Sequence, residues 1–129
     1  MPEPVWVDRL VVEVIHEDQL REHGGLAGIR DENALEAALA RPQQKRHYEQ
    51  SDVATLAAAY AYRLCQGHPF RDGNKRVAFV TMMVFLGLNG WELKVEEPEV
   101  VTLMLSLASG KLSERALTEW LRERIHRNK

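Results

Sequence analysis

The segment from His68 to Arg76, with the sequence HPFRDGNKR, gathers side chains that suit phosphate chemistry. The imidazole of His68 can take a proton near neutral pH, so it can activate an incoming hydroxyl group. Asp72 supplies a hard carboxylate oxygen, which is the kind of ligand that anchors Mg²⁺. Gly73 lets the backbone approach a ligand closely. The segment therefore predicts a site for an anion that carries a metal ion.

Lys75 and Arg76 follow in the expected first turn of a helix. Unpaired backbone N–H groups and the helix dipole make this position unfavourable for cations and favourable for anions. Two basic residues there make physical sense if a multivalent anion such as a polyphosphate is bound. Taken singly, each residue of the loop has an ordinary explanation as a turn, a cap or a solvated charge. Their coincidence in one short loop favours an enzyme that uses a nucleoside triphosphate.

Two helical patterns precede the loop. The range Asp31–Ala40 begins with a good N-cap residue, carries apolar residues on one face and is followed by Pro42. The range Ser51–Gln66 also begins with a cap residue, has an apolar stripe and stops at Gly67. The loop is therefore expected to start where a helix ends.

The helix after the loop is expected to begin with Asn74 as its cap and to run to the pair Asn89-Gly90. This stretch is apolar on nearly all sides. Such a helix belongs in the middle of a bundle, because no surface position would hide so many methyl groups. We therefore predict that it is the buried centre of the fold.

The remaining patterns are mostly helical. Pro98–Ser109 and Ser113–His126 are predicted as helices, and Trp91–Val95 as a short extended connection. Leu10–His16 fits both a strand and a helix, so the type of element with which residues 8–23 begin stays open. Together the patterns predict an all-α fold, a compact bundle of about six helices around a buried central helix. One domain is expected to cover residues 1–129.

The composition narrows the classes of function. The chain has 129 residues, 45% hydrophobic and 28% charged, which suits one globular domain. A net charge of -2 gives no general attraction to nucleic acid, so a helix-turn-helix DNA binder is a weak alternative. The start of the chain lacks a signal-peptide pattern, and the apolar segment Val77–Leu88 is too short to cross a bilayer. With a single cysteine, Cys65, in a packing role, we expect a cytoplasmic protein that binds no membrane.

Several other polar residues are expected to lie outside the site. Arg30 and Asp31 are interpreted as a helix cap with a neighbouring charge. The other histidines have no partner at the spacing of metal ligands and are taken as surface or structural residues: His16, His23, His47 and His126.

The loop resembles the Fic/Doc family, and in particular its death-on-curing branch, the toxins of toxin and antitoxin pairs. The family pattern is His, any residue, Phe, any residue, Asp or Glu, a small residue, Asn, Lys or Gly, then Arg. It is met by His68, Phe70, Asp72, Gly73, Asn74, Lys75 and Arg76. Residues 24–32 and 39–43, Asn89-Gly90 and residues 108–110 also resemble death-on-curing proteins, so the resemblance covers nearly the whole chain.

The resemblance implies a compact helical bundle, the Fic/Doc fold, and a role for each residue of the motif. His68 would be the base for a Ser, Thr or Tyr hydroxyl of a target protein, and Phe70 would anchor the loop. Arg76 would neutralise charge that develops in the transition state. Asp72 would hold Mg²⁺. The contacts to the ATP phosphates would come from Gly73, Asn74, Lys75 and Arg76.

Two positions bear on the reaction that the resemblance implies. The Fic branch, which mostly transfers AMP, usually has Gly where Lys75 stands and a second Arg where Phe79 stands. The death-on-curing branch shares both departures, and its members resemble kinases that phosphorylate a threonine of elongation factor Tu and so halt translation. We therefore favour phosphoryl transfer from ATP. An AMP (nucleotidyl) transferase and a non-enzymatic peptide-binding module remain the alternatives.

The resemblance also implies a partner. A cognate antitoxin would place a segment of its chain in a hydrophobic groove beside the active site, where it would block the nucleotide or the target.

Overall fold

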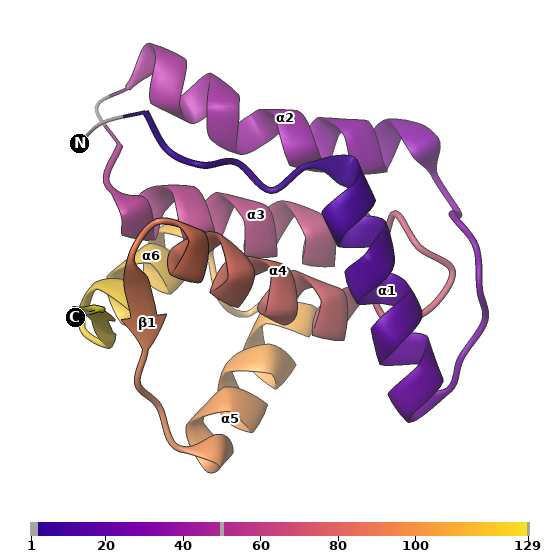
Figure 1. The fold of residues 1–129 in the computed structure, drawn as a ribbon. Coiled ribbons are helices and arrows are strands. Elements are labelled where there is room, and N and C mark those ends of the chain that lie inside the picture. Colours follow the sequence, from indigo (N-terminus) through magenta and orange to yellow (C-terminus); the bar gives the residue numbers. More distant parts are fainter. Residues whose placement is uncertain (1–2, 50, 129) are drawn as a thin grey trace.

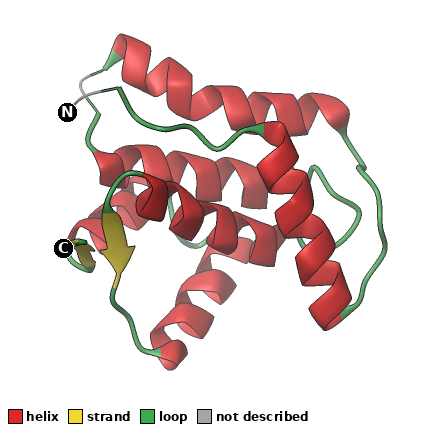
Figure 2. Cartoon of the chain, in the orientation of Figure 1, coloured by secondary structure: helices red, strands yellow, loops and turns green. Residues whose placement is uncertain are grey.

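The computed structural model describes residues 3–49 and 51–128, which form six helices and two short strands (Figure 1). The fold is all-α, as predicted, with one small two-stranded antiparallel sheet at its edge (Figure 2). The elements in chain order are α1 (Arg9–His23), α2 (Glu32–Tyr48), α3 (Val53–Gly67), α4 (Asn74–Leu88), β1 (Trp91–Leu93), α5 (Glu97–Ala108), α6 (Glu114–Arg122) and β2 (Ile125–Arg127).

Helices α3 and α4 form the centre of the bundle. Helices α2, α5 and α6 contact α3, while α1 and α5 contact α4. Ten residues of α3 are buried against six of α4, so the more deeply buried helix is α3 and not, as predicted, the one after the loop. The five buried alanines of α3 let neighbouring helices approach it closely on several sides: Ala54, Ala57, Ala58, Ala59 and Ala61. Helix α4 is as apolar, but it leaves Met83 and Leu88 exposed.

The first element is a helix, which settles the question that the sequence left open. The carboxylate of Asp8 caps α1 by accepting a hydrogen bond from the Val11 N–H. Val12, Ile15 and His16 are the buried residues of this helix. Their spacing is that of a helical stripe, and burial of the stripe outweighs the strand preference of the β-branched residues.

Helix α2 is longer than predicted. Its N-cap is Asp31, as expected, but the helix continues through Pro42 to Tyr48. Pro42 is buried, and packing of α2 along α3 compensates for the backbone hydrogen bond that a proline cannot donate. Helix α3 is capped by Asp52, whose carboxylate accepts the Thr55 N–H at 2.9 Å, and not by Ser51.

The C-terminal part also differs from the prediction. Helix α6 ends at Arg122 instead of His126, and the chain then forms β2, which pairs with β1. The Arg127 guanidinium lies 5.0 Å from the centre of the Trp91 ring in this pairing. The predicted extended connection at Trp91–Val95 is therefore confirmed as a strand for its first three residues. Within the described residues, no helix combines the length and apolar character needed to span a membrane.

Candidate functional site

The loop between α3 and α4 begins with an unusual backbone conformation at His68. This residue ends α3 in the left-handed region, at φ 47° and ψ 53°, and it alone among the described non-glycine residues has a positive φ. A left-handed residue turns the chain sharply away from the helix axis, and in a residue other than glycine it is strained. His68 is exposed at this turn. Strain of this kind, held in place by its surroundings, is common at functional sites.

Arg30 holds the start of the loop. Its Nε donates to the His68 carbonyl oxygen at 2.7 Å, and its Nη2 donates to the Gly67 carbonyl oxygen at 3.1 Å. A cation is favourable here because the last carbonyls of a helix are unpaired and carry the negative end of its dipole. Asp31 caps α2 as predicted, but Arg30 is more than the neighbouring charge that the sequence suggested.

The chain before α2 runs antiparallel to the loop. Ile29 and Phe70 form an isolated β-bridge, and the Arg71 N–H donates to the Gly28 carbonyl oxygen at 3.1 Å. The N–H groups of Arg30 and Asp31 both donate to the Pro69 carbonyl oxygen. These bonds fix the loop backbone against a segment that is far away in the sequence.

Phe70 and Asn74 fix the middle of the loop. The Phe70 side chain is 1% exposed and lies in the core, which fits the predicted anchor. The Asn74 side chain bonds to both backbone groups of Phe70, accepting from the N–H and donating to the carbonyl oxygen, each at 2.9 Å. Asn74 is therefore the first residue of α4 and not its cap. The cap position belongs to Gly73, which has a left-handed φ of 82° and no side chain to cap the helix.

His16 contacts the same loop from α1. Its ring stacks on Phe70, with ring centres 3.9 Å apart and planes 17° apart. Its Nε2 lies 2.9 Å from the Asp72 carbonyl oxygen. His16 is therefore a buried structural residue, one of the two roles expected for it, and it does not line the pocket of the loop, whereas His23, His47 and His126 are exposed, as expected. The sequence shows only that position 16 shares a helical face with Val12, so this contact could not be inferred from it.

Asp72 is oriented by a backbone hydrogen bond. Its Oδ2 accepts from the Leu26 N–H at 2.8 Å. Among the described residues, no group of three or more His, Cys, Asp or Glu side chains could hold a metal ion. A single carboxylate suits Mg²⁺ that arrives with a nucleotide, because this ion keeps several waters and binds to one or two carboxylates and the substrate phosphates.

The predicted residues other than Phe70 line one surface pocket of about 290 Å³, together with Arg71: His68, Asp72, Gly73, Asn74, Lys75 and Arg76. This volume is small beside the roughly 300 to 1,000 Å³ of a typical ligand pocket, so it suits a polyphosphate group better than a whole nucleotide. The Nε of Arg76 is buried and has no hydrogen-bond partner among the described residues. The pocket therefore combines an exposed imidazole, one carboxylate and basic side chains at the start of a helix.

Cys65, at the end of α3, is buried in the core. Burial raises the pKa of its thiol, and the positive charge of Lys75 opposes this effect only in part. A thiol that stays protonated is a poor nucleophile, so Cys65 has a packing role.

Comparison with known proteins identifies relatives of this chain. The model of the Fic/DOC family matches residues 6–86. Protein kinase doc of Escherichia phage P1 is 32% identical over 109 residues, which cover 84% of this chain and 86% of the relative. Toxin Doc of Mycolicibacterium smegmatis is 36% identical over 75 residues, 57% of this chain and 58% of the relative.

A solved structure shares the fold. It is the N-terminal Fic domain of a VirB-translocated Bep effector protein from Bartonella quintana, with bound ADP. The two structures superpose with a TM-score of 0.51 and 17% sequence identity, over 75% of this chain and 48% of the other. The match of the family model and the similarity to the phage protein lead to one conclusion: the chain belongs to the Fic/DOC family.

Proposed function

We propose that this protein is the toxin of a type II toxin and antitoxin pair, and that it transfers phosphate from ATP to a Ser or Thr hydroxyl of a protein. The pocket that carries His68, Asp72 and Arg76 together is the observation on which the proposal depends. The names of two relatives support it, since one is a protein kinase and the other a toxin. We also propose that residues 1–129 act as a single Fic/Doc-like domain.

The residues of the loop would carry out the transfer as follows. His68 accepts the proton of the target hydroxyl while the hydroxyl oxygen forms a bond to the γ-phosphorus. The bond between this phosphorus and the oxygen that bridges to the β-phosphate breaks, so ADP leaves with that oxygen. Arg76 neutralises the charge that develops on the phosphoryl group in the transition state.

The remaining residues of the loop would bind the nucleotide. Gly73, Lys75 and Arg76 would contact its phosphates at the start of α4. Asn74 would take part from beside them, although its amide is bonded to Phe70 in this structure. Asp72 would hold Mg²⁺, which when bound neutralises charge on the β- and γ-phosphates.

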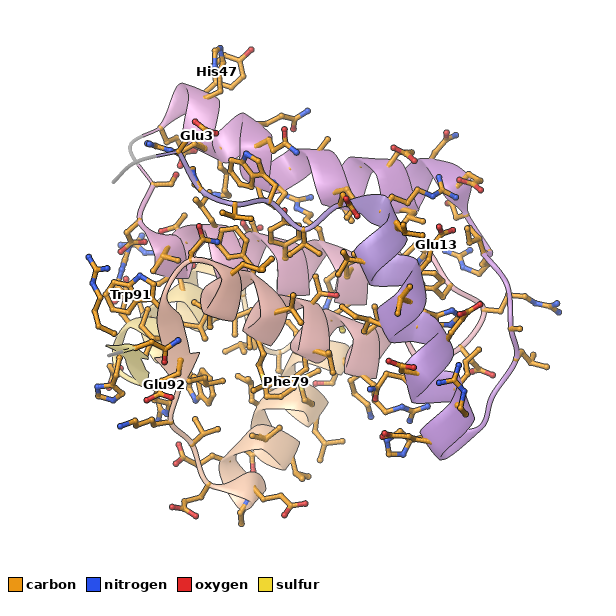
Figure 3. All side chains as sticks on the ribbon, in the orientation of Figure 1. Glu3, Glu13, His47, Phe79, Trp91 and Glu92 are labelled. Atoms are coloured by element: carbon orange, nitrogen blue, oxygen red, sulfur yellow. The ribbon has the colours of Figure 1, made fainter. Side chains whose placement is uncertain are left out.

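Phe79 favours phosphoryl transfer over nucleotidyl transfer. It lies one turn after Arg76 on α4, packs partly buried against the core and sits on the side of α4 that faces α5 (Figure 3). An arginine at this position would give the outer phosphates a second cation. Without this arginine, no cation at position 79 fixes the outer phosphates while the α-phosphate reacts.

The target and the antitoxin are proposed from the resemblance to death-on-curing toxins. The target is elongation factor Tu, so the effect would be inhibition of translation in the cytoplasm. The antitoxin segment would cover apolar side chains that α1 and α4, which pack together, leave exposed: Leu10, Val14 and Met83. Positions 10 and 14 are one helical turn apart, a spacing that suits an amphipathic partner helix.

Isotope transfer tests the proposal. The protein is incubated with purified elongation factor Tu and ATP labelled in either the α or the γ position, with the His68→Ala variant as control. Label from the γ position on the target, absent with the variant, is the expected result. Label from the α position alone would show a nucleotidyl transferase. No transfer from either position, with the target and a cell lysate both tested, would favour a binding module.

A further inference from the structure

His16 is buried between α1 and the loop, and nothing in the proposed chemistry uses it. The residue is 5% exposed, and its ring stacks on Phe70 of the loop. A Cβ atom built on Gly73 would lie 3.7 Å from the Cδ2 of His16, so a side chain at position 73 would meet the ring edge. The imidazole therefore stacks on Phe70, lies near Gly73 and bonds to the Asp72 carbonyl oxygen.

The hydrogen bond shows that one particular nitrogen of the ring carries a proton. A carbonyl oxygen only accepts, so the Nε2 of His16 must carry a proton and donate it at 2.9 Å. In a trans peptide the C=O and N–H groups point in opposite directions. Holding the Asp72 carbonyl toward α1 therefore turns the Gly73 N–H away from α1, and Gly73 lines the pocket.

The same peptide also carries the Asp72 side chain. Its carboxylate reaches the Leu26 N–H at 2.8 Å, a bond that requires the Asp72 backbone to keep one orientation. We propose that His16 is a positioning residue, which orients the Asp72 carboxylate and the Gly73 N–H toward the phosphates of a metal-bound nucleotide. The inference rests on the proposed function, because it assumes that this pocket binds such a nucleotide.

Two variants separate the hydrogen bond from the ring packing. His16→Phe keeps an aromatic ring on Phe70 but cannot donate to the Asp72 carbonyl. His16→Gln loses the stacking but keeps an N–H donor near the position of Nε2. His23→Phe is the matched control, because His23 is an exposed histidine of the same helix.

The first measurement is calorimetric binding of Mg²⁺ with a non-hydrolysable ATP analogue. Loss of an outer contact that orients a ligand typically weakens binding by about tenfold or more, and we expect this for His16→Phe. His16→Gln should bind within about threefold of the original protein. Binding by His16→Phe that equals the original, or equal loss by both variants, would overturn the inference.

The second measurement does not need nucleotide. Hydrogen exchange of the Leu26 amide reports on the Asp72 carboxylate that accepts from it. We expect His16→Phe to accelerate this exchange by roughly fivefold, and His16→Gln and His23→Phe to leave it nearly unchanged. Unchanged exchange in His16→Phe would refute the positioning of Asp72 by His16. A lack of nucleotide binding by the original protein would refute the proposed function, and the exchange data would still decide whether His16 positions Asp72.

Discussion

Arg30 donates from its Nε to the carbonyl oxygen of His68 at 2.7 Å, and so bonds directly to the backbone of the expected catalytic base. His68 has a left-handed conformation that a residue other than glycine adopts only at some energetic cost. The bond to Arg30 and the packing of the loop beyond it hold this conformation. The chain thereby turns at His68 instead of continuing the helix, and the imidazole stays exposed beside the pocket.

Replacement of Arg30 should impair the reaction more than the binding of nucleotide. Arg30→Ala frees the carbonyls of residues 67 and 68, and we expect kcat to fall by about tenfold, because small displacements of a catalytic group have large effects. Arg30→Lys should retain part of the activity, since an ammonium can reach one carbonyl. Steady-state transfer assays measure the kcat of both variants. A wild-type kcat in Arg30→Ala would show that the bond does not position His68.

Two replacements of His68 should give the same activity but different stabilities. Both His68→Ala and His68→Gly remove the base, so transfer should fall by roughly 10² to 10⁴-fold. Glycine adopts a φ near 47° without strain, so His68→Gly should be more stable than His68→Ala by about 1 kcal/mol. Urea unfolding followed by circular dichroism gives the difference. Equal stabilities would mean that the left-handed turn is not present in solution.

Phe70 should be the residue of the loop that matters most for stability. It is 1% exposed, so Phe70→Ala should lower the free energy of unfolding by about 3 to 5 kcal/mol. Phe70→Leu fills part of the cavity and should lose less than half of that. Arg71→Ala, at the exposed neighbouring residue, is the control. Urea unfolding should show that it changes the free energy of unfolding by less than about 0.5 kcal/mol. A small effect of Phe70→Ala would mean that the ring does not anchor the loop.

Asp52 should make stability depend on acid pH. Burial disfavours its charged form, but hydrogen bonds from Arg122 and Thr55 outweigh this and hold its pKa at about 2, against 3.8 for the free side chain. Because the pKa is lower in the folded state, the stabilisation is present above pH 3.8 and is lost as the pH falls through 2. With 49% of the side chain exposed, solvent screening limits it to about 1 kcal/mol.

Asp52→Asn tests this account, because asparagine keeps the N-cap of α3 and removes the charge. The variant should be less stable than the original protein by about 1 kcal/mol at pH 7, and the difference should shrink toward pH 2. Thermal unfolding at a series of pH values shows this directly. A difference that stays constant from pH 7 to pH 2 would contradict the ion pair with Arg122.

The site could be predicted from the sequence because its chemical groups are contiguous. His68, Asp72 and Arg76 lie in one loop, so a local pattern sufficed to place them around one pocket. The residues that hold the loop could not be predicted in this way. His16 and Arg30 come from segments far away in the chain, and only tertiary packing brings them to the loop.

The fold shows the same division between local and tertiary causes. The helix cap Asp31 was evident from the sequence because capping is a local hydrogen bond. The continuation of α2 through Pro42 was not, because packing on α3 decides it. The strand at Ile125–Arg127 was missed for a similar reason, since its partner, β1, is more than thirty residues earlier in the chain.

The proposed function requires that the start of α4 binds the phosphates of a nucleotide beside His68. The most direct measurement is a titration of isotope-labelled protein with Mg²⁺ and a non-hydrolysable ATP analogue, followed by amide chemical shifts in NMR spectra. We expect the largest shifts at the amides of Gly73, Lys75 and Arg76. Shifts confined to the hollow of about 380 Å³ that Trp91 and Arg127 line in part, or no shifts at all, would contradict it.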